Sequence, residues 1–280
     1  MFKRILNLKK YLKPSDIALF LKALYRNRKI IHQMARDDFR NQFLGSFLGV
    51  FWAFVQPLVF VFALWFVFSL GLRQARGEAP VPFVLWLMAG MFLWFFFSQS
   101  ILRGTGAILE SSYLVKNVKF QVSILPVIKI VSALNVHVIF ILLLLLLYVG
   151  NGIWPNLYWL QIIYYLAGTL ALEIGLTWIF SSLTVFVKDV SQIVQIMIRI
   201  GFWLTPVFWS IDRMPSSIQF ILKLNPMYYL VQGYRDSLIY KTGFWEHPHL
   251  TLYFWTVTFL ILVFGGIVFR RLRPHFADVL

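Results

Sequence analysis

Long apolar runs separated by short polar stretches fill most of the chain between residues 47 and 269. A transmembrane helix requires about 20 predominantly apolar residues, and six runs approach or exceed that length. We expect membrane spans at about 47–70, 83–102, 124–149, 158–187, 190–211 and 250–269. The pattern therefore predicts an all-α integral membrane protein with six transmembrane helices, in which residues 30–280 form a single transmembrane domain.

Residues 30–45, directly before the first span, have the period of an amphipathic helix that lies flat at the membrane interface. The apolar arc of this helix comprises Ile31, Met34, Ala35, Phe39 and Phe43. Asp38 falls inside the arc, where a helix that met only lipid would carry an apolar residue, so we expect part of this face to contact protein.

A stripe of basic residues, His32, Arg36 and Arg40, follows the edge of that arc. The stripe has two interpretations. It is either a solvated face that orients membrane insertion, or a site for a phosphate-bearing lipid head group. It ends one turn before the first span begins, which makes the second interpretation worth testing.

The segment 212–243 is too apolar for an ordinary loop and too charged for a span. Asn225 and Pro226 interrupt it, because the residue before a proline avoids the helical conformation. Two short amphipathic helices are predicted around this break. They form either a re-entrant pair between the fifth and sixth spans, whose backbone must be satisfied by protein or trapped water, or an amphipathic loop that lies on the bilayer.

Composition supports a membrane location and changes how the charge is interpreted. Hydrophobic residues make up 60% of the chain and charged residues only 13%, whereas soluble domains carry about 25% charged residues. The net charge of +15 does not indicate a nucleic-acid partner, because Lys and Arg gather in cytoplasmic loops of membrane proteins. Their distribution predicts a basic cytoplasmic segment at 1–29, without an evident signal peptide, and both termini on the cytoplasmic side.

The sequence offers no catalytic residues, no metal site and no cofactor site. It contains no cysteine, no pair of histidines at helical spacing, no nucleophile elbow and no clustered carboxylates. A Gly-x4-Gly-Lys-Ser/Thr loop is also missing, so an ATP-driven process would need a separate ATPase subunit to bind ATP.

Ionisable residues inside predicted spans are candidates for function by default. Glu173 and Arg199 lie in the consecutive fourth and fifth spans, at depths that differ by roughly 8 Å at 1.5 Å per residue. They form a structural ion pair, or contact substrate, or Arg199 extends to the interface. The same alternatives apply to His137 and Lys129 in the third span, where Lys129 is near enough to the cytoplasm to extend its ammonium there.

Several motifs occur in a specific order. They are "LGSFLGVFWAFVQP" at 44–57, "KDVSQIVQ" at 188–195, "LTPVFW" at 204–209, "LNPMYYLVQGYRDSL" at 224–238 and the tail "FRRLRPHFADVL". From about residue 30 to the end, the chain resembles the type 2 ABC exporter permeases that move lipid-linked cell-surface polymers such as O-antigen and teichoic acid. The latter half looks most like the teichoic acid permeases.

The resemblance implies a permease subunit of the bacterial cytoplasmic membrane that forms a homodimer and pairs with two ATP-binding-cassette subunits, which bind ATP and Mg. The substrate would be a polyprenyl-(pyro)phosphate-linked glycan or teichoic acid, passing between the two permeases. His32, Arg36 and Arg40 become candidates for the lipid phosphate. The loop Arg103–Ser123 would contact the ATPase through Glu110, Ser111, Ser112 and Tyr113. Asn225, Pro226, Tyr228 and Tyr229 would belong to a re-entrant cap on the outer side.

The chain departs from the family pattern at two places, and two other functions remain open. The family often has an Arg-Tyr pair where this chain has Gln42 and Phe43, and an Arg where this chain has Lys188, which keeps the charge but not the bidentate fork. A type 2 ABC permease for small amphipathic drugs would share the fold. A membrane enzyme acting on lipid-linked sugars would need clustered acids or histidines that the outer loops do not show.

Overall fold

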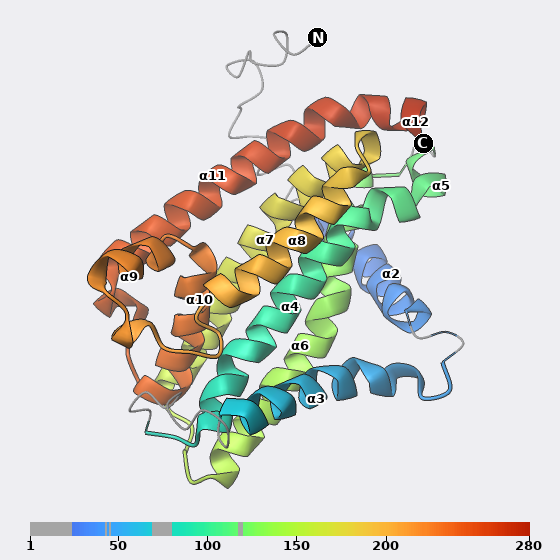
Figure 1. Ribbon diagram of the computed structural model, residues 1–280. Coiled ribbons are helices and arrows are strands. Elements are labelled where there is room, and N and C mark those ends of the chain that lie inside the picture. The colour runs from blue at the N-terminus through green and yellow to red at the C-terminus, as the bar shows by residue number, and fades with distance from the viewer. Residues whose placement is uncertain (1–23, 43, 45, 69–79, 117–119) are drawn as a thin grey trace.

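The computed structural model describes all residues except 1–23, 43, 45, 69–79 and 117–119. The described part is helical, as expected, and its regular elements are α-helices joined by short 3₁₀ and π turns (Figure 1). Most of the basic segment predicted at 1–29 lies outside the described residues. The interface helix expected at 30–45 is present as α2 (Arg28–Asn41).

Five of the described helical segments are long and apolar enough to cross a membrane. They contain α3 (Trp52–Phe66), α4 (Phe83–Glu110), α6 (Leu125–Gly150), α7 (Gln161–Phe186) and α11 (Pro248–Leu272). Each coincides with one of the predicted spans, which confirms the type and order of these elements. The protein is therefore a multi-pass membrane protein.

The helix at the fifth predicted span is shorter than expected. We expected a span at 190–211, but α8 (Asp189–Leu204) has 16 residues and ends at Leu204. Thr205 then adopts an extended conformation, with φ −89° and ψ 131°, because Pro206 follows it and disfavours a helical residue at that position. At 1.5 Å per residue α8 is about 24 Å long, shorter than the roughly 30 Å hydrocarbon core.

Helix α4 is longer than its predicted span and forms the centre of the bundle. It has 28 residues and continues to Glu110, so the expectation that a loop begins at Arg103 is wrong. The helix contacts α3, α6, α7, α8 and α10, and most of its side chains are buried. The short α5 (Ser112–Val115) follows it.

Helices α7 and α11 lie side by side and run in the same direction. Phe254 lies next to Gly168, and Ile261 next to Gly175. At the far end of this pair, Phe276 of the terminal turn α12 (Phe276–Val279) contacts Phe186. Figure 1 shows that α12, α5 and one end of α2 lie at one end of the bundle, whereas α9 (Ser216–Lys223) and α10 (Pro226–Arg235) lie toward the other.

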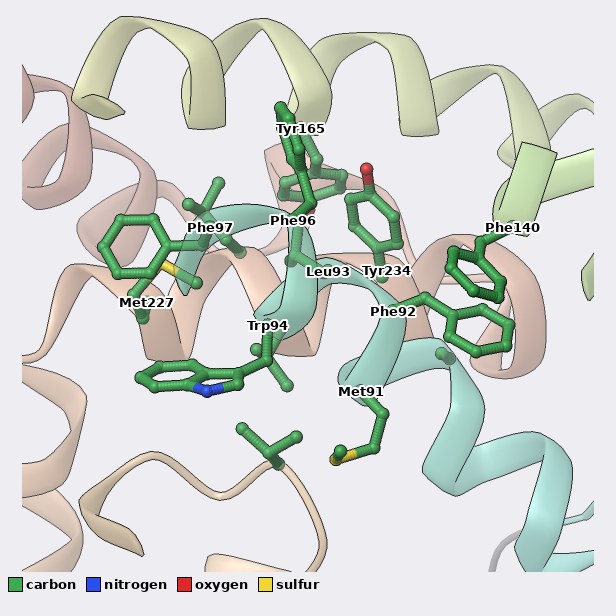
Figure 2. Packing of buried hydrophobic residues seen from close by; sticks show 14 of the residues in the cluster. Met91, Phe92, Leu93, Trp94, Phe96, Phe97, Phe140, Tyr165, Met227 and Tyr234 are labelled. Atoms are coloured by element: carbon green, nitrogen blue, oxygen red, sulfur yellow. The ribbon is translucent and has the colours of Figure 1, made fainter. Parts of the chain in front are cut away.

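Two apolar clusters hold the described helices together. The larger one is rich in aromatic side chains of α4 and α6; Figure 2 shows Phe92 against Phe140, whose ring centroids are 4.5 Å apart. The smaller cluster lies near α5 and α12 and includes Ile31, Ala35 and Ile108. Burial of these apolar faces, at about 25 cal/mol per Å², attaches α2 to the membrane helices.

Candidate functional site

The buried face of α2 rests on the transmembrane helices. Ile31 and Ala35 are buried, and α2 packs against α6. At the start of the helix, the side chain of Asn27 donates a hydrogen bond of 3.1 Å to Gln121, in the segment that follows α5. The predicted apolar arc is thus a protein-contacting face, at least over its first two turns.

Asp38 occupies the centre of a charge cluster formed by α2, α4 and α6. Its carboxylate accepts hydrogen bonds from Arg103 Nη2 at 2.5 Å and from Lys129 Nζ at 2.6 Å. Lys129 Nζ also lies 2.5 Å from Glu110 Oε2. The expectation that Asp38 meets protein is confirmed. Of the alternatives left open for Lys129, the structure shows an ion pair, in which its ammonium is shared by two carboxylates.

The environment of Asp38 keeps it ionised. Burial by itself raises the pKa of this carboxyl, but the hydrogen bond from Lys129 and the positive charge of Arg103 outweigh burial, and the net pKa is lowered. Arg103 uses its second nitrogen to donate a hydrogen bond of 3.0 Å to Gln42. A charged acid in an apolar helix face is therefore explained by two cations on neighbouring helices.

His32, Arg36 and Arg40 lie on the exposed side of α2. None of the three forms an ion pair with another described residue. The predicted stripe thus remains open to a ligand or to solvent. The cluster around Asp38 fixes the helix that carries it.

The four residues expected to contact the ATPase lie together where α4 ends and α5 begins. Glu110 is the last residue of α4 and Ser111 caps α5. Tyr113 is 70% exposed. Glu110 instead directs its carboxylate to Lys129, although 57% of its side chain is still exposed. Residues 117–119 of this segment lie outside the described part.

The two helices around Asn225 differ in burial. Helix α9 is largely exposed, but α10 is packed into the bundle. Asn225 caps α10 by accepting a hydrogen bond from the amide of Met227, and its amide donates to Thr205 Oγ1 at 2.7 Å. Pro226 occupies the first turn of α10, where no backbone donor is needed. Tyr228 and Tyr229 are both buried. The α10 part of this segment is not a loop on the bilayer.

Tyr229 connects α10 to α7 and α11 through hydroxyl groups. Its oxygen lies 3.0 Å from the Tyr164 hydroxyl and 2.9 Å from Thr251 Oγ1. Its ring stacks on Phe254, with 4.8 Å between centroids. These contacts satisfy the phenol inside the protein, as buried tyrosines require.

Arg235 is the largest fully buried side chain among the described residues, and its role was not predicted from the sequence. Its guanidinium lies over the ring of Trp86 at 3.4 Å from the centroid. Two of its nitrogens donate hydrogen bonds to the backbone carbonyls of Pro206 and Val207, at 2.8 and 2.5 Å. Arg235 therefore holds the non-helical segment after α8 against α4, by a cation–π contact and by hydrogen bonds.

Glu173 and Arg199 do not meet. Glu173 on α7 is fully buried, and within the described residues its carboxyl oxygens have no hydrogen-bond partner. Ser100 and Tyr234 are polar neighbours of this carboxyl. Tyr234 in turn lies 3.0 Å from His137 Nε2, and the His137 ring stacks on Phe96.

Arg199 is exposed on α8. It forms part of a polar stripe with Ser191 and Gln195, one turn apart from each other. With Leu102, Val194 and Ile198 these side chains line a shallow hollow of about 190 Å³. The stripe was not recognised in the sequence, although the spacing of four residues was visible there.

The described residues offer no metal centre. No three His, Cys, Asp or Glu side chains within that part of the chain gather closely enough to hold an ion. The arrangement places three exposed basic side chains on α2 and a polar stripe on α8.

Comparison with known proteins agrees with this architecture. The family model described as "ABC-2 type transporter" matches residues 30–239. The O-antigen export system permease protein RfbA of Klebsiella pneumoniae is 25% identical over 250 residues, which cover 88% of this chain and 93% of that protein. RfbA of Myxococcus xanthus is 26% identical over 266 residues, covering 92% and 98%. The match extends from α2 to α10, and the chain belongs to the ABC-2 type transporter family.

Proposed function

We propose that the protein is the permease subunit of an ATP-driven exporter that moves a polyprenyl-(pyro)phosphate-linked polysaccharide outward across the bacterial cytoplasmic membrane. The observation that carries this proposal is the exposed stripe of His32, Arg36 and Arg40 on a helix fixed at one end of the bundle. Arginine presents paired donors that match phosphate geometry. The names of the relatives favour an O-antigen type of polymer over a teichoic acid.

The passage in this proposal lies between two copies of the chain. Helices α3 and α8 leave many large apolar side chains exposed, among them Phe62, Phe66, Ile196 and Trp203. Such a face needs lipid or another protein to cover it. A second copy set against α3 and α8 would enclose the polar stripe Ser191, Gln195 and Arg199 and give a polar chain a route through apolar surroundings. In this arrangement α8 serves as the fifth of six spans and α9–α10 as a re-entrant cap.

A separate ATPase supplies the energy. Two ATP-binding-cassette subunits, carrying ATP and Mg, would dock on the cytoplasmic end of the permease dimer, at the exposed Tyr113 and the adjacent Ser111 and Ser112. This places both termini on the cytoplasmic side, where the basic residues of the tail also meet anionic lipid.

The test is ATP hydrolysis by the purified complex of this permease with its ATPase, with and without polyprenyl-pyrophosphate-linked glycan. We expect the glycan to stimulate hydrolysis by the wild-type complex and not by the Arg36→Ala/Arg40→Ala variant. Lys188→Ala/Arg273→Ala is the matched control, because it removes two exposed cations outside α2. A complex that is never stimulated by glycan, but is stimulated by an amphipathic drug, would overturn the proposal in favour of drug export.

A further inference from the structure

Lys129 lies where two moving parts of an exporter would meet. One carboxylate that it binds, Asp38, belongs to α2; the other, Glu110, ends α4 directly before α5. Resting on the function proposed above, we propose that Lys129 is a positioning residue that couples the ATPase-contacting segment to the helix that recognises the lipid phosphate.

The two salt bridges of Lys129 differ in strength. Asp38 is held by two cations, Lys129 and Arg103, and only 15% of its side chain is exposed. Glu110 is held by Lys129 and is 57% exposed. Water weakens the exposed pair more than the buried one. The salt bridge to Asp38 therefore fixes Lys129 to α2, and the salt bridge to Glu110 is the weaker of the two links between α2 and the start of α5.

A second contact joins the same two segments at the other end of α2. Asn27 donates to Gln121, and Gln121 donates to Ser123, whose carbonyl accepts a hydrogen bond from Trp178 of α7. Between these contacts, Ile31 and Ala35 belong to the same apolar cluster as Val122 and Leu125. Helix α2 is thus attached at both ends and along one face to described residues on either side of α5, and these contacts are the route by which displacement of α5 reaches α2.

The first test uses the complex with its ATPase and removes the two salt bridges of Lys129 one at a time. Glu110→Gln removes the carboxylate of one salt bridge, and Asp38→Asn removes the carboxylate of the other. We expect each variant to lose stimulation by lipid-linked glycan, measured as the ratio of the rates of ATP hydrolysis with and without glycan in the same preparation. The double variant should lose no more than either single one, because groups that act as one unit are not additive. Lys129→Arg should keep part of the stimulation, and Lys129→Met none.

Asp278→Asn is the matched control, since it removes another exposed carboxylate, 76% accessible, which belongs to α12 at the same end of the bundle. Full stimulation in both Glu110→Gln and Asp38→Asn would overturn the inference and leave Lys129 a structural residue. Failure of the proposed function looks different, because the wild-type complex itself would then ignore the glycan.

A distance measurement that needs no glycan also separates failure of the coupling from failure of the proposed function. The chain has no cysteine, so spin labels can be attached through Gln33→Cys and Tyr113→Cys, both at exposed positions, without removing native thiols. We expect the distance between the two labels within one chain to stay narrow and unchanged between nucleotide-free and ATP-bound complexes, and to broaden in Glu110→Gln. A distance that changes on ATP binding in the wild-type complex would show that α2 and α5 move independently and would refute the coupling.

Discussion

Gly265 lies directly against the backbone of Gly175, at the point where α11 crosses α7. A Cβ atom placed on Gly265 would overlap the carbonyl oxygen of Gly175, and one placed on Gly175 would lie 2.9 Å from the amide nitrogen of Leu262. Small residues allow membrane helices to approach this closely, so that packing between backbones replaces the hydrophobic driving force that lipid does not supply.

Gly265→Ala should therefore destabilise the protein by about 1–3 kcal/mol, the usual cost of overpacking. The obstructing atoms belong to the backbone and cannot rotate away. Gly266→Ala is the control, because its Cβ would meet its nearest neighbour, Trp178, only at 3.8 Å. Thermal unfolding of the purified permease in detergent measures both. Equal melting temperatures for the two variants would contradict the close approach of α7 and α11.

Arg235→Lys should lower stability although the charge is kept. A lysine cannot reproduce the planar fork that lies over Trp86 and donates to the carbonyls of Pro206 and Val207. A buried acceptor without a donor costs about 1–3 kcal/mol. We expect a lower melting temperature and faster proteolysis of the segment after α8. Arg273→Lys, at an exposed position, should change neither; if it matches Arg235→Lys, the effect is not specific to the buried fork.

The sequence predicts the membrane helices well because hydrophobic length is a local property. The end of α4 was not predictable in this way. Arg103 and Glu110 look like loop residues in the sequence, but they continue a helix because their charges are matched by Asp38 and Lys129, and the Asp38 contacts join residues 65 and 91 positions apart. Asp38 itself was recognised, since it interrupts an apolar arc, but its partners belong to other helices.

Arg235 illustrates a different limit of sequence reasoning. Its partners are two backbone carbonyls and a tryptophan ring on α4, and backbone carbonyls leave no mark in a residue pattern. The end of α8, by contrast, has a signal in the sequence, because Pro206 disfavours a helical backbone conformation at Thr205. The exposed stripe on α2 was predicted from periodicity alone, since exposure of one helix face is again a local property.

Substitution of Glu173, unlike the substitutions above, is expected to keep or raise the stability of the protein. Its buried carboxyl has no hydrogen-bond partner within the described residues, and burial of such a group is costly. Glu173→Leu should therefore leave the melting temperature unchanged or raise it, because an apolar side chain suits the site better. Asp38→Leu is the contrasting variant and should lower it, since Arg103 and Lys129 would lose their shared anion. If Glu173→Leu destabilises the permease as strongly as Asp38→Leu, the carboxyl must bind a water or ion that stabilises the fold.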